Sequence, residues 1–326
     1  MAATSFASLE RLAQTFGTSD PSKRMLVIVN PYATTVSERL KHLVVYALQG
    51  RYQVDSVETQ SRNHATELCR EAAQEGYDVV CAFGGDGTLN EAANGLVGSD
   101  TPLTCLPGGS ANVFARILGI PNDVVDATEH LLRIADDFRP RPIDLGVVNG
   151  RRFLFTAGVG LDASVTQQVD AHPRLKARYG PWFYSAAAVS AFSREYAMKP
   201  PRLVTSVDGQ EIEGVTAIIQ NTTPYTFFGR RPVELSEGVS LDDGTLAGVV
   251  LRRASLLDMP SVGWRALSRS ASIVRHRRVE GFSGAESLTV RTGDDRELPL
   301  QVDGDYLGTV PEATFSIDHH GLRIVA

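Results

Sequence analysis

The chain has 326 residues, of which 43% are hydrophobic and 21% charged, a composition typical of a globular protein with room for about two domains. No apolar run approaches the roughly 20 residues of a membrane-spanning helix, and residues 1–24 lack the basic and apolar segments of a secretory signal. The three cysteines, Cys69, Cys81 and Cys105, have no metal-ligand spacing. Their odd number argues against a disulfide framework, so we expect core residues in a cytoplasmic protein.

The net charge of −6 is unevenly distributed. Residues 139–278 hold 19 Lys and Arg against 12 Asp and Glu, whereas the remainder of the chain holds 13 against 26. This basic middle section fits a face for an anionic surface or ligand, and ordinary solvated arginines explain it equally well. No interleaving of basic and aromatic residues indicates a nucleic-acid site.

The first part of the chain alternates between apolar strands and amphipathic helices. A tail at 1–24, partly helical, would dock through Leu9, Leu12 and Phe16. The patterns after it predict strands at 25–30, 52–58, 78–83 and 103–106, and helices at 36–48, 64–74, 113–118 and 124–135, with one more helix after residue 88. Such alternation indicates an α/β domain with a parallel sheet covered on both faces. Ligands of these sheets bind beyond the carboxyl ends of the strands.

Short β-like runs replace this pattern after Arg139-Pro140-Arg141-Pro142. They lie at residues 143–148, 152–157, 203–207, 215–220, 246–251, 287–291 and 298–302, many of them separated by glycine or Asp-Gly turns. One helical stretch at about 174–196 interrupts them. The pattern predicts a mostly antiparallel, β-rich second domain, either a sandwich or a flattened barrel.

A glycine-rich turn follows the strand that ends at Phe83, with the sequence Gly84-Gly85-Asp86-Gly87-Thr88. A turn of this kind before a helix N-terminus binds phosphate well, because free N–H groups and the helix dipole favour anions. The carboxylate of Asp86 would repel phosphate unless a metal ion lies between the two. We therefore expect a nucleotide-phosphate site with Mg²⁺.

A second glycine turn, Pro107-Gly108-Gly109-Ser110-Ala111-Asn112, also lies between a strand and a helix. Asn30 and Thr59 follow two further strands, so four strand ends converge on one edge of the sheet. A Walker A loop is excluded because no lysine follows a glycine, and protein-kinase catalytic-loop signatures are absent. The GxGxxA pattern at 157–163 lies in the β-rich half, where tight packing of a strand on a helix explains its glycines better than NAD binding.

Two acidic turns lie in the β-rich half, Asp242-Asp243-Gly244 and Asp303-Gly304-Asp305. Asp-Gly is a common hairpin signal, so each is explained by turn formation alone. The additional carboxylates also fit a Mg²⁺ site and a general base. Asp144, at the junction of the two halves, is either a third site carboxylate or a salt-bridge partner.

Taken together, these motifs resemble the diacylglycerol kinase catalytic-domain family, which includes bacterial lipid kinases and the sphingosine and ceramide kinases. The resemblance spans about residues 25–326. The turn at 84–88 is shared with NAD kinases and phosphofructokinases, whereas the stretch from Pro107 to Arg116 is more specific to lipid kinases. The family resemblance implies three parts: a tail at 1–24, an α/β nucleotide-binding domain at 25–142 and a β-rich lipid-binding domain at 143–311. Residues 312–326 would return to the first domain, and the nucleotide cleft would lie between the two domains.

The resemblance also implies the cofactors ATP and Mg²⁺ and a set of site residues. The positions that correspond to nucleotide binding are Asn30, Pro31, Tyr32, Ala33, Thr34, Thr59, Gly84, Gly85, Asp86, Gly87, Thr88, Leu89, Asn90, Gly109, Ser110 and Asn112. Asp86 would bind the phosphate-bridging Mg²⁺, and Asp243 would bind a structural Mg²⁺ with backbone oxygens of Ser240 and Thr245. Asp305 would be the general base, and Asp144 would help to position the metal or the substrate.

Three positions depart from the family pattern: Ser110 replaces a threonine, Val113 replaces an aspartate, and Asp305 is one methylene shorter than the usual glutamate. The implied function is ATP-dependent phosphorylation of a lipid alcohol, with diacylglycerol the default and ceramide or a sphingoid base as alternatives. The enzyme would act peripherally at the anionic inner face of a membrane, with a homodimer possible. An NAD kinase-like soluble enzyme and a non-catalytic lipid- or nucleotide-binding protein remain alternatives of other classes.

Overall fold

The computed structural model describes residues 9, 12, 23–171, 201–255, 257–268 and 271–326. The chain forms two compact units: residues 1–143 with 320–326, and residues 144–319. The helix predicted at 174–196 and Phe16 lie outside the described residues. Leu9, in the N-terminal tail, is fully buried, and Leu12 is half-buried.

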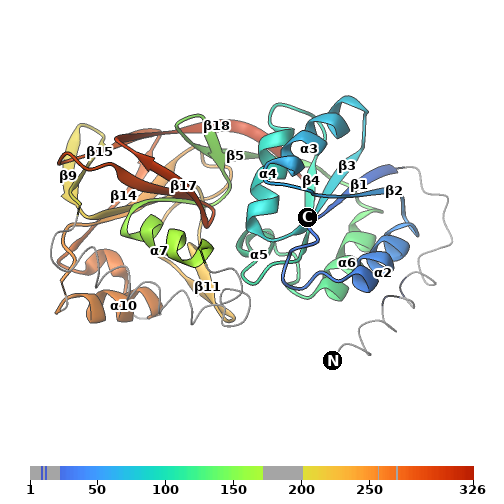
Figure 1. Ribbon diagram of the computed structural model, residues 1–326, viewed down its shortest axis with the longest axis horizontal. Helices are drawn as coiled ribbons and strands as arrows, with labels where there is room; N and C mark the ends of the chain where they lie inside the picture. The colour runs from blue at the N-terminus through green and yellow to red at the C-terminus, as the bar shows by residue number, and fades with distance from the viewer. Residues whose placement is uncertain (1–8, 10–11, 13–22, 172–200, 256, 269–270) are drawn as a thin grey trace. The chain divides into compact units, whose positions relative to one another are not determined.

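The first unit is an α/β domain whose strands run in the order β2-β1-β3-β4 and are all parallel. Right-handed crossovers place helices on both faces of such a sheet. Figure 1 shows α2 with α6 and α3 with α4 on opposite sides of the strands. The elements are β1 (Lys23–Val29), α2 (Glu38–Leu48), β2 (Tyr52–Glu58), α3 (His64–Gln74), β3 (Val79–Gly84), α4 (Asp86–Leu96), β4 (Leu103–Pro107), α5 (Val113–Ile117) and α6 (Val124–Ile134).

Central strands of this sheet are buried on both faces, which is why they read as continuous apolar runs. All of β3 and β4 is buried. Cys69, Cys81 and Cys105 are free thiols in this core, as predicted, and burial raises their pKa values. The end of the chain returns here, where Ile324 pairs with Leu103.

Side-chain caps fix the starts of two helices. The Ser37 hydroxyl accepts the Leu40 N–H at 3.3 Å, and the Asp123 carboxylate accepts the Val125 N–H at 2.9 Å. The Gly-rich turn is shorter than predicted, because α4 begins at Asp86. Its first turn carries no periodic apolar residue, so hydrophobic periodicity detects the helix only from Leu89 onward.

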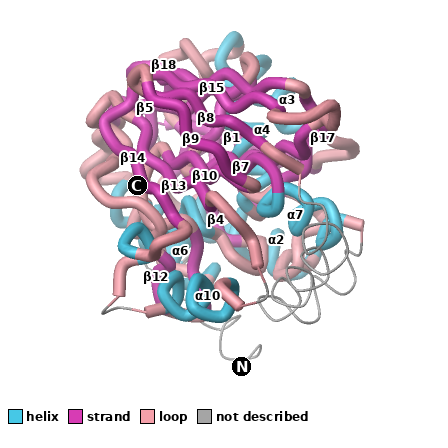
Figure 2. Tube along the Cα trace, turned by 90° about the vertical axis from the view of Figure 1, so that its left-hand side faces the viewer, coloured by secondary structure: helices cyan, strands magenta, loops and turns pink. Residues whose placement is uncertain are grey.

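The second unit is a β-sandwich of mostly antiparallel strands, as predicted. One sheet contains the run β18-β15-β8-β9 together with β5 and β6, and the other has the order β14-β13-β10-β7-β16-β17. Figure 2 draws these strands in magenta, with β13 and β10 adjacent. The strands are β5 (Arg141–Val148), β6 (Arg151–Phe153), β7 (Thr156–Gly160), β8 (Leu203–Val207), β9 (Gln210–Gly214), β10 (Thr216–Gln220), β11 (Thr226–Phe228), β12 (Arg231–Val233), β13 (Leu246–Leu251), β14 (Val279–Ala285), β15 (Ser287–Thr292), β16 (Leu298–Val302), β17 (Asp305–Val310) and β18 (Glu312–Ile324).

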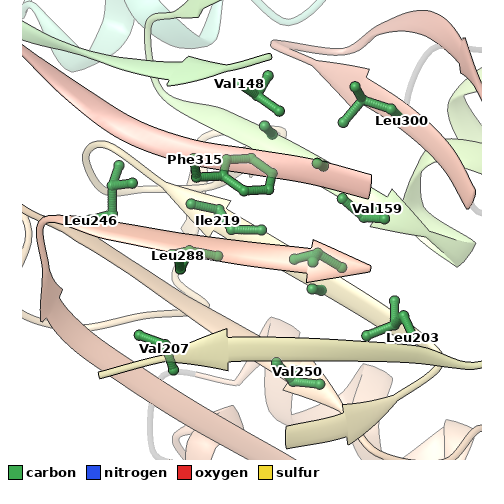
Figure 3. Packing of buried hydrophobic residues seen from close by; sticks show 14 of the residues in the cluster. Val148, Val159, Leu203, Val207, Ile219, Leu246, Val250, Leu288, Leu300 and Phe315 are labelled. Carbon is green, nitrogen blue, oxygen red and sulfur yellow. The ribbon is translucent and has the colours of Figure 1, made fainter. Parts of the chain in front are cut away.

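The core of this sandwich is formed by inward-facing side chains of both sheets (Figure 3). Leu288 and Phe315 come from one sheet, and Val159, Ile219 and Leu300 come from the other. Alternation of inward and outward residues along each strand produces this arrangement.

Helix α7 (Leu161–Asp170) follows β7 directly, in agreement with the packing of a strand on a helix inferred for the glycines at 157–163. Helix α10 (Met259–Leu267), followed by a short 3₁₀ turn, η2 (Ile273–Arg275), was not predicted. It contains Pro260 and Gly263, which weaken the helical signal. Among the described residues, no helix is long and apolar enough to cross a bilayer.

Candidate functional site

The two glycine turns of the first unit pack backbone against backbone. The Gly108 N–H donates to the Gly84 carbonyl at 2.7 Å. A Cβ added to Gly108 would lie 2.9 Å from the Gly84 Cα, and one added to Gly109 would lie 2.8 Å from the Gly85 Cα. No side chain fits at that distance, so both turns need glycine for this close approach.

Polar side chains hold the second turn in place. Asn112, in the left-handed region at φ 47°, accepts the Gly109 N–H at 2.8 Å and donates to the Gly109 carbonyl at 2.9 Å. The Asp86 Oδ1 accepts the Phe114 N–H, in the first turn of α5, at 3.0 Å. Asp86 therefore links the start of α4 to the start of α5, a role that sequence reasoning did not assign to it.

Asn30 links the loop after β1 to the first glycine turn. Its Nδ2 donates to the Thr88 Oγ1 at 2.9 Å, and its Oδ1 accepts the Tyr32 N–H at 3.0 Å. The Thr59 N–H donates to the Val29 carbonyl, which places Thr59 at the same carboxyl edge of the sheet. The structure thus gathers the four strand ends that the sequence predicted to converge.

The other predicted nucleotide-binding residues divide by exposure. Those on the surface or half-buried are Pro31, Tyr32, Ala33, Thr34, Gly85, Asp86, Gly87, Gly109 and Ser110. Leu89 and Asn90 are 4% and 1% exposed, and the Asn90 Oδ1 accepts from Asn94. These two residues therefore lie behind the turn, where they support α4.

Arg116, in α5, is electrostatically coupled to the carboxylate of Asp86. Burial lowers the pKa of Arg116, and the negative charge of Asp86 acts in the opposite direction. An anion bound at the start of α4 would meet backbone N–H groups beside the Asp86 carboxylate, and this carboxylate is electrostatically coupled to Arg116.

In the second unit, the turn between β16 and β17 gives its two aspartates different roles. Asp303 is 3% exposed, and its carboxylate accepts the N–H groups of Leu154, Phe155 and Thr156 at 2.7–3.1 Å. Asp305 is half-buried at the first position of β17. Asp303 thus fixes the turn, which leaves Asp305 as the carboxylate of this turn that suits chemistry.

Helix α7 supports this turn at both of its ends. The Gln301 Oε1 accepts the Gly304 N–H at 2.9 Å, while its Nε2 donates to the Asp162 Oδ2 at 2.6 Å. At the other end of α7, the Asp170 Oδ2 accepts the Tyr306 N–H at 3.3 Å. Two carboxylates of α7 therefore bind residues on either side of Asp305: Asp162 binds Gln301, and Asp170 binds Tyr306.

Asp162 is half-buried, and desolvation raises its pKa, partly offset by hydrogen bonds from Tyr225 and Gln301. Gly158 has no room for a side chain, because an added Cβ would lie 1.9 Å from the Asp162 Oδ2. The prediction that packing explains the glycines at 157–163 is confirmed. Asp162 lies within this same pattern, but the sequence analysis interpreted only the glycines and did not identify the aspartate as a site residue.

Asp144 and Asp243 organise the loop before β13. Asp144 is 2% exposed, and its Oδ2 accepts the Gly244 N–H at 2.9 Å. Asp243 accepts the N–H groups of Ser240 at 2.7 Å and Thr245 at 3.0 Å. These carboxylates complete a hydrogen-bonded turn, and their role in metal binding or catalysis stays a prediction.

No cluster of three or more His, Cys, Asp or Glu side chains that could hold a metal ion occurs in the described part of the chain. At Asp86, however, the donor set fits Mg²⁺, which commonly takes one or two carboxylates and completes its shell with water and substrate phosphates. At Asp243 the N–H groups of Ser240 and Thr245 donate to the carboxylate.

Two family models match almost the whole chain. The diacylglycerol kinase catalytic domain matches residues 24–148, and the YegS C-terminal NAD kinase beta sandwich-like domain matches residues 156–326. The chain belongs to the diacylglycerol kinase catalytic-domain family. It is accordingly a lipid kinase, as the resemblance predicted.

Relatives agree with this family over most of their length. A diacylglycerol kinase of Bacillus subtilis (strain 168) is 28% identical over 305 residues, which cover 91% of this chain and 95% of the relative. One of Staphylococcus aureus (strain MRSA252) is 27% identical over 91% of each chain. A solved structure of a diacylglycerol kinase from Bacillus anthracis str. Sterne has a TM-score of 0.66 at 21% identity, covering 93% of this chain and 96% of that one, and shows the shared fold.

Proposed function

We propose that this lipid kinase transfers the terminal phosphoryl group of ATP to the hydroxyl of a lipid alcohol, with diacylglycerol as the first substrate to test. The observation that carries the proposal is the pair of glycine turns in backbone contact, held by Asp86 and Asn112. The relatives named diacylglycerol kinase support the choice of lipid.

Phosphoryl transfer requires positioning and charge stabilisation more than covalent chemistry. The backbone N–H groups at the start of α4 would bind phosphate oxygens without reorganising, because the glycine contacts already fix the turn before it. Mg²⁺ at Asp86 would neutralise charge on the phosphates. Asn30 would keep the Thr88 hydroxyl oriented beside them.

Asp305 would accept the proton of the lipid hydroxyl as it attacks. A carboxylate acts as a general base when it lies within hydrogen-bond reach of the proton that it removes. The turn that presents Asp305 is anchored at two points, because the Asp303 carboxylate accepts the Leu154 N–H and the Gln301 Oε1 accepts the Gly304 N–H. Where the shorter aspartate side chain falls short of the hydroxyl, one water molecule would relay the proton.

The deciding experiment is incubation with labelled ATP, Mg²⁺ and a panel of diacylglycerol, ceramide, sphingoid base and NAD. We expect label in diacylglycerol, and lower labelling in the Asp86→Ala and Asp305→Ala variants. Label in ceramide or a sphingoid base would move the substrate within the lipid class. Label in NAD alone would contradict a lipid substrate, and MgATP binding without transfer would support a binding protein.

A further inference from the structure

Helix α10 has two apolar faces. A hydrophobic cluster separate from the sandwich core contains Val215, Val249 and Leu251 of the β-rich unit. Val262 is buried in this cluster, and Met259 and Ala266 pack against it. This is the face at positions i, i+3 and i+7, which attaches the helix to the sandwich. An ordinary surface helix would be polar on its opposite side.

The outward side of α10 is apolar instead. Trp264 and Leu267 are 60% and 53% exposed, and Leu257, in the turn just before the helix, is 92% exposed. Within the helix, Pro260, also exposed, precedes Trp264 by four residues and Leu267 by seven, which places these three on one side. Together with Leu257 we call them the α10 stripe. This stripe contains three of the six large hydrophobic side chains that are exposed among the described residues, so it is a concentrated patch rather than scattered surface.

Cationic residues surround the stripe. Residues 252–278 contain seven arginines and a single acidic residue, Asp258. Asp258, immediately before α10, forms ion pairs with Arg277 and Arg278, and the Arg265 guanidinium donates to the Ser272 carbonyl at 3.1 Å. These bonds hold the arginine-rich segment after η2 against the helix.

We propose that the α10 stripe and its arginines form the surface by which this kinase docks on an anionic lipid bilayer. Trp and Leu side chains beside Arg are typical of helices that lie in the plane of a membrane interface. The positive charge selects anionic lipid over neutral lipid and over a second copy of this helix, which would bring like charges together. The proposal deepens the proposed function, because it states how the enzyme would reach a substrate that stays in the bilayer.

The test is co-sedimentation of the full chain, without ATP, with vesicles of phosphatidylcholine containing or lacking phosphatidylglycerol. We expect binding to the anionic vesicles that weakens with added salt. The double variant Trp264→Ser/Leu267→Ser removes apolar contact and should bind at least about tenfold more weakly. The double variant Arg253→Gln/Arg275→Gln removes two exposed cations, each contributing about fivefold in partitioning.

The matched control is Tyr46→Ser in α2, which removes an aromatic side chain that is 58% exposed on the other unit. It should bind vesicles as the parent protein does. All variants alter exposed positions, and their thermal unfolding is measured to confirm that they fold. Unchanged vesicle binding in both double variants would overturn the proposal. Equal binding of the parent protein to neutral and to anionic vesicles would also overturn it.

Vesicle binding is measured without phosphoryl transfer, so its outcome is separate from that of the kinase assay. If α10 binds anionic vesicles but no lipid is phosphorylated, the docking surface stands and the proposed function fails. If lipid in detergent micelles is phosphorylated and vesicles are not bound, the reverse holds. Sedimentation velocity tests for self-association. If the protein is a dimer that Trp264→Ser dissociates, and this variant still binds vesicles as the parent does, the stripe is a dimer interface and docking on lipid is contradicted.

Discussion

Asp86 combines two roles that substitution can separate. Its Oδ1 accepts the Phe114 N–H, and its charge would serve the phosphates and Mg²⁺. We expect Asp86→Asn to keep the hydrogen bond but lower kcat/KM by about 100-fold or more, as loss of a preorganised electrostatic group does. Steady-state kinetics and thermal unfolding of the same samples measure the two effects.

Asp86→Ala is the matched comparison, because it removes the acceptor as well. It should lose as much activity as the Asn variant and, in addition, about 1–3 kcal/mol of unfolding free energy from the unpaired Phe114 N–H. Equal stability of the two variants would contradict the structural role. Activity retained in Asp86→Asn would contradict the electrostatic one.

Asp305 is the residue whose proposed role depends most on side-chain length. Asp305→Asn cannot accept a proton and should lower kcat by about 10²–10⁴-fold, whereas Asp305→Glu should remain active because the carboxylate is kept. Rates measured at several pH values separate the variants. An Asp305→Asn enzyme with parental kcat would show that another group accepts the proton.

At the scale of elements, α7 and the β16–β17 turn behave as one support. Gln301→Leu removes the acceptor of the Gly304 N–H and the donor to Asp162. We expect kcat to fall by about tenfold while the KM for ATP stays unchanged, because a misplaced catalytic group costs rate rather than nucleotide binding. The control Thr309→Ala, which breaks an exposed bond farther along β17, should leave kcat intact.

A purely structural role of Gln301 would lower only stability. The distinguishing readout is the acidic limb of the kcat profile, which should shift in Gln301→Leu if the turn sets the environment of Asp305. An unshifted limb with a lowered melting temperature would restrict Gln301 to folding.

Asp162 predicts a specific dependence of stability on pH. Burial raises its pKa in the folded state above the unfolded value, so the folded chain binds the proton first as pH falls. Its carboxylate therefore destabilises the fold at neutral pH, and this cost is relieved between the raised pKa and the ordinary value near 4. We expect Asp162→Asn to have the higher free energy of unfolding at neutral pH, and urea unfolding should show that this difference from wild type becomes smaller as the pH falls. A difference that grows as the pH falls would contradict the raised pKa.

At the scale of the whole molecule, residues from both ends of the sequence build the first unit. Ile324 is 1% exposed and pairs with Leu103, and the Val325 N–H donates to the Leu103 carbonyl at 3.0 Å. Ile324→Ala should cost about 2–5 kcal/mol of unfolding free energy. Hydrogen exchange should locate this loss in β1 to β4.

The neighbouring Arg323 provides the control for that prediction. It is half-buried, with its guanidinium 3.9 Å from the exposed Asp100 carboxylate, so Arg323→Ala should change stability by no more than about 0.5 kcal/mol. Equal costs at the two positions would show that the terminal strand is not part of the core.

Sequence patterns alone predict the parallel sheet, the two glycine turns and the β-rich second half. These features are local, because apolar runs, Asp-Gly turns and glycine pairs record constraints within a few residues. Which carboxylates support the fold depends instead on contacts between distant parts of the chain. Asp303 and Asp305 are two residues apart and look alike in sequence, but their roles depend on N–H groups that approach Asp303 from residues 154–156. The exposed stripe of α10 was likewise beyond sequence patterns, because burial of one apolar face and exposure of the other is set by packing across the chain.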